Sequence, residues 1–233
     1  MNQKIAIVGA GKMGKAMLKA LPNATAYDRE SDLAAVLPDA DIIIFAVKPQ
    51  DFQNIKIDLS EKLVISIMAG ISIDKVKAQT SATQVVRSMP NLPLQVQAGL
   101  TGWFATPEVE KDIVSQIFQA FGQEIEVENE SDLDKITALS GSGPAYFFYL
   151  TELLQSKAEA LGFTSDQAKT IANQTFIGAA KLLKSSDKTA KEFREAVTSK
   201  GGTTEAALNT LDIQENFNAA IDAAQQKSKE LNS

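Results

Sequence analysis

The chain has 233 residues, 44% of them hydrophobic, and a formal net charge of -6 at pH 7. This length fits one large or two modest domains, and the acidic balance argues against nucleic acid or a membrane surface as a partner. The chain has no cysteine and no histidine, which excludes disulfides, thiolate nucleophiles, Ser-His-Asp triads and histidine-based zinc sites. We expect no metal and, because no leader segment or span of ~20 apolar residues is present, a cytoplasmic location.

The N-terminal segment is a strand, a glycine-rich turn and a helix in immediate succession. Residues 4–8 are mostly apolar, residues 9–14 form the pattern G-x-G-x-x-G, and residues 15–21 are helix formers. In such a turn the first glycine allows the tight bend, the second allows close approach of a diphosphate, and the third allows the helix to pack against the strand. We predict a dinucleotide-binding turn formed by Gly9, Ala10, Gly11, Lys12, Met13 and Gly14.

The second predicted strand, residues 24–28, ends on an acidic residue 19 positions after Gly9. Asp28 at this place is suited to the 2'-hydroxyl of an adenosine ribose, which favours NAD. Arg29, with Ser31 as an additional donor, is instead suited to the 2'-phosphate of NADP. These residues are compatible with either cofactor.

Apolar strands alternate with helices as far as residue 128, which is typical of a parallel sheet covered on both faces. The predicted α/β fold is therefore a doubly wound, mostly parallel sheet followed by a helical part, because no strand-like run recurs after residue 128. We place the domain boundary there, giving domains 1–128 and 129–233. The further strands are expected at residues 41–47, 63–67, 83–88, 100–105 and 124–128, with a helix at residues 107–121.

Helix starts in the second half carry capping signals. Pairs typical of a capping box occur at Ser131 with Asp134, Thr164 with Gln167 and Thr189 with Glu192, and Pro144 suits a first helical turn. The helices that follow have wide apolar faces, such as the stripe Leu150, Leu153, Leu154, Ala158 and Leu161. Such a surface is expected to bury part of its area against a second subunit.

Two loops follow predicted strands at the edge where open α/β sheets bind ligands. The first loop comes after the third strand and would border the ribose of the cofactor; the second comes after the fifth strand and would reach the nicotinamide side. The residues assigned to the cofactor here are Ala46, Val47, Lys48, Pro49 and Asn91.

Two glycine- and hydroxyl-rich loops precede helices in the second half. Residues 140–146 suit close approach of a small ligand or the nicotinamide ring, and residues 197–204 offer N–H and O–H donors at a helix start, as a carboxylate receptor does. A dinucleotide fingerprint together with these loops favours a small acid as substrate. Because the chain lacks imidazole, a C=N substrate fits best: an imine nitrogen arrives already protonated and accepts hydride at carbon without a positioned acid.

The chain resembles the Δ1-pyrroline-5-carboxylate reductases over essentially its whole length. Residues 9–14, 46–49, 85–91, 140–146 and 197–204 match the family in order and approximate spacing, the last two segments most specifically. Lys200 stands where many members have proline.

The resemblance implies a Rossmann domain, a helical domain that interlocks with its mate in a homodimer and sometimes in larger rings, and NAD(P)H-dependent reduction of 1-pyrroline-5-carboxylate to L-proline. It implies that Thr204 is the catalytic residue, placed to hydrogen-bond the ring nitrogen of the substrate. The predicted substrate-binding residues are Ser142, Gly143, Ser199, Gly201, Gly202, Thr203 and Thr204.

Two other functions remain to be distinguished. A β-hydroxyacid dehydrogenase requires a lysine four residues after a glycine run and an asparagine four further on, but counting from Gly143 gives Phe147 and Thr151. Lys169 and Asn173 share the i, i+4 spacing on a helix without that run. A non-catalytic dinucleotide sensor would need no donor-rich acid pocket.

Overall fold

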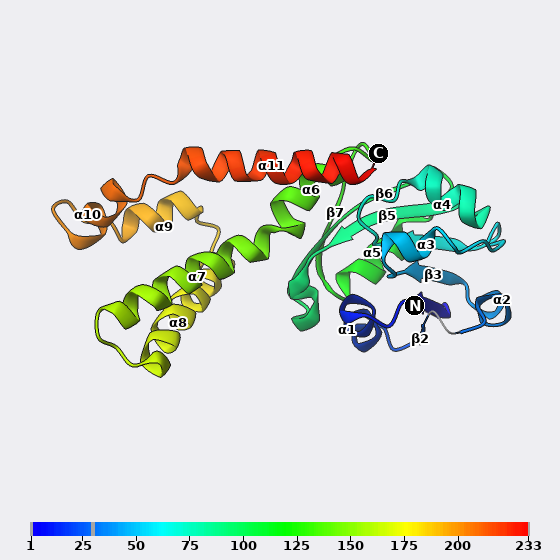
Figure 1. Ribbon diagram of the computed structural model, residues 1–233, viewed down its shortest axis with the longest axis horizontal. Helices are drawn as coiled ribbons and strands as arrows, with labels where there is room; N and C mark the ends of the chain where they lie inside the picture. Colours follow the sequence, from blue (N-terminus) through cyan, green and yellow to red (C-terminus); the bar gives the residue numbers. More distant parts are fainter. Residues whose placement is uncertain (1, 29–30, 233) are drawn as a thin grey trace. The chain divides into compact units, whose positions relative to one another are not determined.

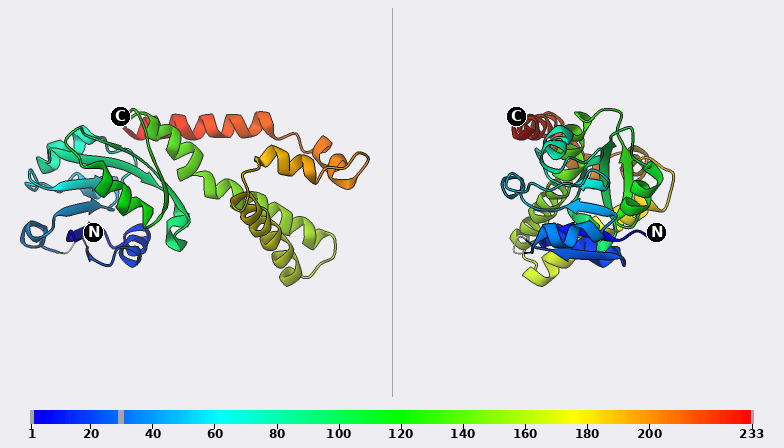
Figure 2. Two further views of the ribbon diagram at one scale, coloured as in Figure 1. Left: turned by 180° about the vertical axis from the view of Figure 1, so that it is seen from behind. Right: turned by 90° about the vertical axis from the view of Figure 1, so that its right-hand side faces the viewer.

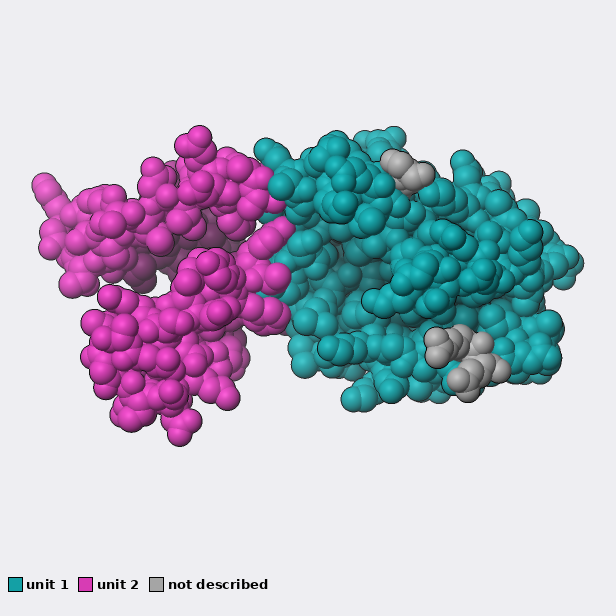
Figure 3. All heavy atoms as spheres, viewed as in Figure 1, with its two compact units in different colours: residues 1–144, 221–233 teal, residues 145–220 magenta. Residues whose placement is uncertain are grey.

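The computed structural model describes residues 2–28 and 31–232 and divides the chain into two compact units. Unit 1 comprises residues 1–144 and 221–233, and unit 2 comprises residues 145–220 (Figure 3). This division differs from the expected boundary after residue 128, because residues 129–144 and the end of the chain pack with the sheet.

Unit 1 is built on a twisted sheet (Figure 1), whose seven strands have the order β2-β1-β3-β4-β5-β6-β7. Strands β1 to β5 are mutually parallel, β6 is antiparallel to β5, and β7 is parallel to β6. The expected mostly parallel sheet is confirmed. Because β1 lies between β2 and β3, the winding of the chain reverses there, and this is where such sheets bind ligands. The strands are β1 Ile5–Val8, β2 Ala24–Tyr27, β3 Ile42–Phe45, β4 Leu63–Ser66, β5 Gln84–Pro90, β6 Gly99–Ala105 and β7 Gly122–Glu126.

Helices cover both faces of this sheet, so its strands are buried on both sides. Ile44 enters one core together with α1 and α5, whereas its neighbour Phe45 enters a second core with α3 and α4. This alternation explains why the strands are almost continuously apolar. The helices are α1 Lys12–Ala20, α2 Leu33–Val36, α3 Pro49–Phe52, α4 Ile73–Thr80, α5 Lys111–Gln119 and α6 Asp132–Ile136, with the short turns η1 Leu37–Asp39, η2 Leu92–Val96 and the π-helical η3 Thr137–Gly141.

The last helix, α11 (Gln214–Asn232), ends within unit 1. Gly70, after β4, has a φ of 73°, and a Cβ built on it would lie 2.4 Å from the carbonyl oxygen of Leu231. The Ser228 hydroxyl donates a hydrogen bond of 2.7 Å to the carboxylate of Asp134, and both side chains are buried. The C-terminal turns of α11 are therefore an integral part of the sheet domain.

Unit 2 is helical, as expected. Its helices are α7 Gly143–Ala160, which starts in unit 1, α8 Ser165–Lys184, α9 Ala190–Ala196 and α10 Thr203–Thr210. Helices α7 and α8 lie side by side (Figures 1 and 2), and the rings of Phe147 and Phe176 meet with centroids 5.6 Å apart. Within residues 2–28 and 31–232, no helix combines the length and apolarity needed to cross a bilayer.

The capping predictions have mixed outcomes. Thr164 with Gln167 and Thr189 with Glu192 form complete capping boxes, and Pro144 lies in the first turn of α7, as predicted. The box predicted for Ser131 is wrong: its side chain makes no cap hydrogen bond, and Asp134 instead contacts Arg87 and Ser228. A buried cation recruits this carboxylate more strongly than an exposed helix end does.

Candidate active site

The glycine-rich turn after β1 is tightly packed at two of its three glycines. Gly9 has a φ of 122°, and a Cβ on it would lie 2.5 Å from the carbonyl oxygen of Ala46. A Cβ on Gly14 would lie 1.9 Å from the carbonyl oxygen of Gly9, so helix α1 packs against the turn more closely than any side chain allows. These two glycines are required by the fold itself.

Gly11 is different, because no atom lies within 4 Å of a Cβ built on it. It is the N-cap of α1, makes no side-chain cap bond, and is followed by a first turn without acidic residues. The space above this helix start is therefore open, and the electrostatics there favour an anion. This open helix start lies where the sequence predicts the diphosphate of a dinucleotide cofactor; Ala10, Lys12 and Met13 are the other residues predicted to bind it.

The ends of β2 and β3 adjoin this turn. Val8 of β1 pairs with Tyr27 of β2 on one side and with Phe45 of β3 on the other. Asp28 follows Tyr27 directly, is exposed, and accepts a 3.2 Å hydrogen bond from the hydroxyl of Ser31. The sheet thus brings Asp28 next to the glycine turn, as a ribose contact requires. Arg29 lies outside the described residues.

The loop after β3 is equally close to the turn. The Ala46 N–H donates a 2.8 Å hydrogen bond to the carbonyl of Val8, and the Cβ position of Gly9 is filled by the Ala46 carbonyl. Lys48 is exposed and is the N-cap of α3, and Pro49 occupies the first position of that helix. The predicted cofactor residues Ala46, Val47, Lys48 and Pro49 therefore lie beside Gly9 at the carboxyl edge of the sheet.

Asn91 follows β5 at the same edge, and both ends of its side-chain amide make hydrogen bonds within unit 1. The amide nitrogen donates to the Ser140 hydroxyl at 3.1 Å, and its oxygen accepts from the Leu100 N–H at 2.9 Å. The side chain of Met89 lies 3.5 Å from the Cβ position of Gly141. Asn91 thus fixes the loop of residues 140–143 to the end of β5, which gives Ser142 and Gly143 defined positions.

The loop before α10 contains the other predicted substrate residues, all in unit 2. Gly201 has a φ of 74°, and the N–H of Gly202 donates to the carbonyl of Ser199 at 3.0 Å. Gly202 is the N-cap of α10 and has no side chain with which to cap it. In the part of the chain that the structure describes, no acceptor is bonded to the N–H groups of Thr203 and Thr204. This helix start presents unused donors at its positive end.

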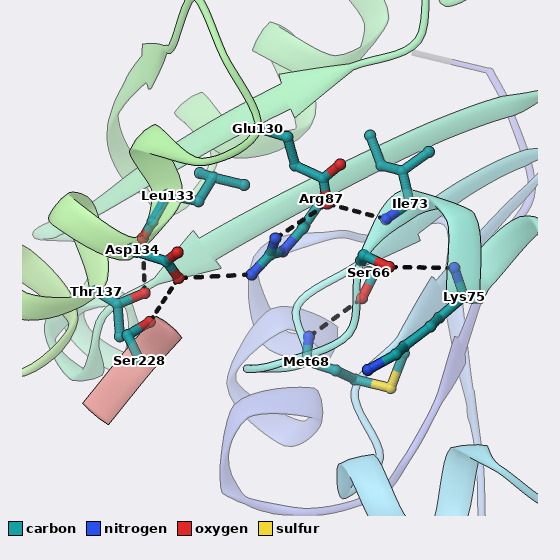
Figure 4. A network of polar contacts seen from close by, with 11 residues as sticks. Ser66, Met68, Ile73, Lys75, Arg87, Glu130, Leu133, Asp134, Thr137 and Ser228 are labelled. Carbon is teal, nitrogen blue, oxygen red and sulfur yellow. Dashed lines mark hydrogen bonds and ion pairs between the residues drawn. The ribbon is translucent and has the colours of Figure 1, made fainter. Parts of the chain in front are cut away.

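Sequence reasoning missed a buried ionic network in unit 1 (Figure 4). The Arg87 guanidinium on β5 lies 3.0 Å from a carboxylate oxygen of Glu130 and 3.9 Å from Asp134. Glu130 also accepts from the N–H of Ile73 at 2.9 Å, and Asp134 accepts from Ser228. The network connects β5, α4, α6 and α11, so it fixes the segment that leads into residues 140–143. An arginine within the apolar run of residues 85–88 was the available signal.

The family model and the curated relatives agree on the family. A family model described as pyrroline-5-carboxylate reductase dimerisation matches residues 130–231. Pyrroline-5-carboxylate reductases of Vibrio alginolyticus and Methanosarcina acetivorans are 33% and 35% identical to this chain, and each alignment covers 99% of the chain and 98% of the relative.

Solved structures agree with these relatives. The chain is similar to a pyrroline-5-carboxylate reductase from Coxiella burnetii, with a TM-score of 0.90, 31% identity and full coverage of both chains. It is also similar to the Plasmodium falciparum pyrroline carboxylate reductase with NADP bound, with a TM-score of 0.88, 30% identity, and coverage of 100% of this chain and 99% of that one. A reductive aminase from Aspergillus terreus, 16% identical with a TM-score of 0.56, shares the fold.

Proposed function

The chain belongs to the pyrroline-5-carboxylate reductase family, and from this membership we propose that it reduces the C=N bond of 1-pyrroline-5-carboxylate with NAD(P)H to give L-proline. The observation that carries the proposal is the start of α10, where unused N–H donors face no competing side-chain cap. A small carboxylate is the ligand that such a helix start accepts.

The cofactor fits the edge formed by β1, β2 and β3. The open space above Gly11 accommodates the diphosphate, and Asp28 is suited to the adenosine ribose. The reduced nicotinamide supplies the hydride. Lys48 and Pro49 border the same edge, and Asn91 acts on this region by holding residues 140–143.

On the substrate side, we assign the carboxylate of the substrate to the N–H groups of Thr203 and Thr204, and the ring nitrogen to the Thr204 hydroxyl. Ser199, Gly201 and Gly202 shape this loop. Ser142 and Gly143, at the start of α7, are the remaining residues assigned to the substrate. The substrate nitrogen arrives protonated, so hydride addition at C5 turns the iminium into an amine and no side-chain acid is required. The absence of histidine from the chain is consistent with catalysis by positioning and charge alone.

The protein acts as a homodimer through its helical domain. Many large apolar side chains of α7 and α8 are exposed in the single chain, as a surface covered by a second copy would be: Phe147, Phe148, Tyr149, Leu150, Leu153, Leu154, Ile171, Phe176, Ile177, Leu182 and Leu183. Assembly of dimers into larger rings, and a cytoplasmic location, are further expectations of the proposed function.

The proposal is tested by following oxidation of NADH and of NADPH with and without added pyrroline carboxylate. The reductase consumes cofactor only when the imino acid is present. A sensor consumes none under either condition, and a β-hydroxyacid dehydrogenase reduces NAD(P)+ when hydroxy acids are supplied in reverse.

The role of Thr204 has its own test. Thr204→Ala removes the hydroxyl assigned to a charged ring nitrogen, so kcat is expected to fall about 10- to 100-fold, as loss of a hydrogen bond to a charged group implies. The KM for NAD(P)H stays unchanged. Thr203→Ala is the matched control, since it retains its backbone N–H, and its kcat should change much less. Wild-type kcat in the Thr204 variant would refute the assignment.

A further inference from the structure

Three helices of unit 2 start in related ways, and the third start is incomplete. At α8 and α9, the side chain of the N-cap threonine accepts a hydrogen bond from the backbone N–H of the third helical residue. The side chain of that third residue accepts a bond in return from the N-cap N–H. At α9 the returned bond runs from the Thr189 N–H to Glu192 at 2.7 Å. Such a box satisfies donors at both positions.

At α10 the bond from the N-cap side chain is missing, and the bond to the third helical residue is displaced by one position. The third helical residue is Glu205, whose carboxylate accepts a 2.7 Å hydrogen bond from the N–H of Gly201, one residue before the N-cap. The N-cap itself is Gly202, which has no side-chain oxygen to accept a hydrogen bond from the first turn of the helix. A Cβ at Gly202 would lie 2.4 Å from the Ser199 hydroxyl oxygen, so a capping side chain fits there only if Ser199 moves.

The bond to Glu205 holds the part of the loop that has a left-handed backbone. Gly201 has a φ of 74°, a conformation with no intrinsic preference in an exposed segment. Its N–H is fixed from one side by a charge-assisted bond to the carboxylate of Glu205, and the next N–H is fixed by the Ser199 carbonyl. Both bonds precede the two donors of Thr203 and Thr204 that the chain leaves unused.

We propose that Glu205 is a positioning residue for substrate binding: it holds Gly201, and thereby keeps the N–H groups of Thr203 and Thr204 aligned for the carboxylate of the substrate. This inference rests on the proposed function. The substrate carboxylate takes the place of the absent N-cap hydroxyl, and Glu205 supplies the half of the box that the protein retains. Glu205 acts through the backbone and does not itself contact the substrate.

The test compares steady-state kinetics of three substitutions at this position. Glu205→Ala removes the acceptor, and we expect the KM for pyrroline carboxylate to rise about tenfold, in line with one lost charge-assisted bond. Glu205→Asp keeps the charge but is one methylene too short to reach Gly201, and is expected to behave like alanine. Glu205→Gln keeps an acceptor oxygen at the right reach, and should stay within about threefold of wild type. The KM for NAD(P)H is unchanged in all three.

Glu192→Ala is the matched control, because it breaks the same kind of bond at the start of α9. It should lower the melting temperature about as much as Glu205→Ala does, without changing the KM for pyrroline carboxylate. An equal rise in KM in the control would show a general loss of helix stability and would overturn the proposal.

Other outcomes are equally decisive. An unchanged or lowered KM in Glu205→Ala overturns the proposal, as does a rise in Glu205→Gln equal to that in Glu205→Asp. If the alanine variant does not fold, the comparison of glutamine with aspartate decides alone. If the wild-type protein has no activity on pyrroline carboxylate, the proposed function is wrong. If the wild type is active and the Glu205 variants are unaffected, only the role of Glu205 is wrong.

Discussion

Units 1 and 2 bury their apolar side chains in opposite ways. In unit 1 the strands place alternate side chains into two cores, and large residues such as Phe45 and Trp103 are almost completely buried by helices of the same chain. In unit 2 the buried hydrophobic residues, among those that the structure describes, are the small ones Ala158, Ala168 and Ala172. Unit 1 therefore has its own cores, whereas unit 2 depends on a second copy to cover its large side chains.

The strongest test of this difference introduces a charge into the exposed apolar face of unit 2. Leu153 on α7 is 47% exposed in the single chain. If a partner covers it, Leu153→Glu buries an unpaired carboxylate, and the dimer should weaken by more than about 3 kcal/mol, roughly a hundredfold in Kd. Light scattering after size exclusion should then report the mass of one chain, together with loss of activity.

The matched control lies in unit 1. Val96 is 75% exposed, and Val96→Glu should leave both mass and activity unchanged, because the proposed dimer contact is formed by the helices of unit 2. A dimer that persists in Leu153→Glu would mean that the face of α7 remains open to solvent.

The next test concerns the ionic network of unit 1, whose contribution should not depend on dimerisation. Arg87→Ala leaves the carboxylates of Glu130 and Asp134 without their buried cation, so the free energy of unfolding should fall by about 3–5 kcal/mol. Urea unfolding at several protein concentrations measures this. Lys111→Ala, which breaks an exposed pair with Glu126, should cost about 1 kcal/mol or less.

Substitutions at two glycines of the turn are expected to have smaller effects, one on cofactor binding and the other on folding. Gly11→Ala places a methyl group in open space, so the free energy of unfolding should change by about 1 kcal/mol or less. The same methyl group occupies the space assigned to the diphosphate, and the KM for NAD(P)H should rise about tenfold. Gly14→Ala should instead impair folding itself, because its Cβ overlaps the Gly9 carbonyl. Equal behaviour of the two variants would argue against the assigned diphosphate position.

The smallest effect is the pH dependence of the helix caps of unit 2. Hydrogen bonds from the backbone N–H and then the hydroxyl of Thr189 hold the pKa of Glu192 below its ordinary value of 4.5. A carboxyl whose pKa is lower in the folded state stabilises the protein above the unfolded pKa, and this contribution is lost as the pH falls through the folded one. The difference in melting temperature between wild type and Glu192→Ala should therefore shrink below pH ~4.5.

The neighbouring box provides the control for this measurement. Gln167 makes the same contacts with Thr164 but carries no titrating group, so the effect of Gln167→Ala should be independent of pH. A constant difference for both variants would mean that the Glu192 carboxylate adds nothing to its box.

The sequence predicts those features of the fold that depend on neighbouring residues. The glycine turn, the apolar strands, the two threonine capping boxes and Pro144 in α7 all follow from local patterns, and each is confirmed. The predicted last strand, residues 124–128, begins instead at Gly122 and ends at Glu126. The assignment of individual site residues to cofactor and substrate stays a prediction.

What local patterns cannot predict depends on partners that are distant in the sequence. Asp134 was expected to cap a helix because Ser131 is near it, but its partners come from β5 and from α11, the latter 94 positions away. The bond between the Gly201 N–H and Glu205 is local, but the sequence did not predict it, because a glycine at the N-cap does not match the Ser/Thr of a capping box.

The return of α11 to the sheet domain has a consequence for synthesis on the ribosome. Asp134 emerges 94 residues before Ser228, which at about 5–20 residues per second is an interval of roughly 5–20 s. During that time the nascent sheet lacks its C-terminal partner, while the whole helical insertion is translated. Early release of the polypeptide would leave this carboxylate without its serine donor, so a shortened product should be a preferred target for proteases.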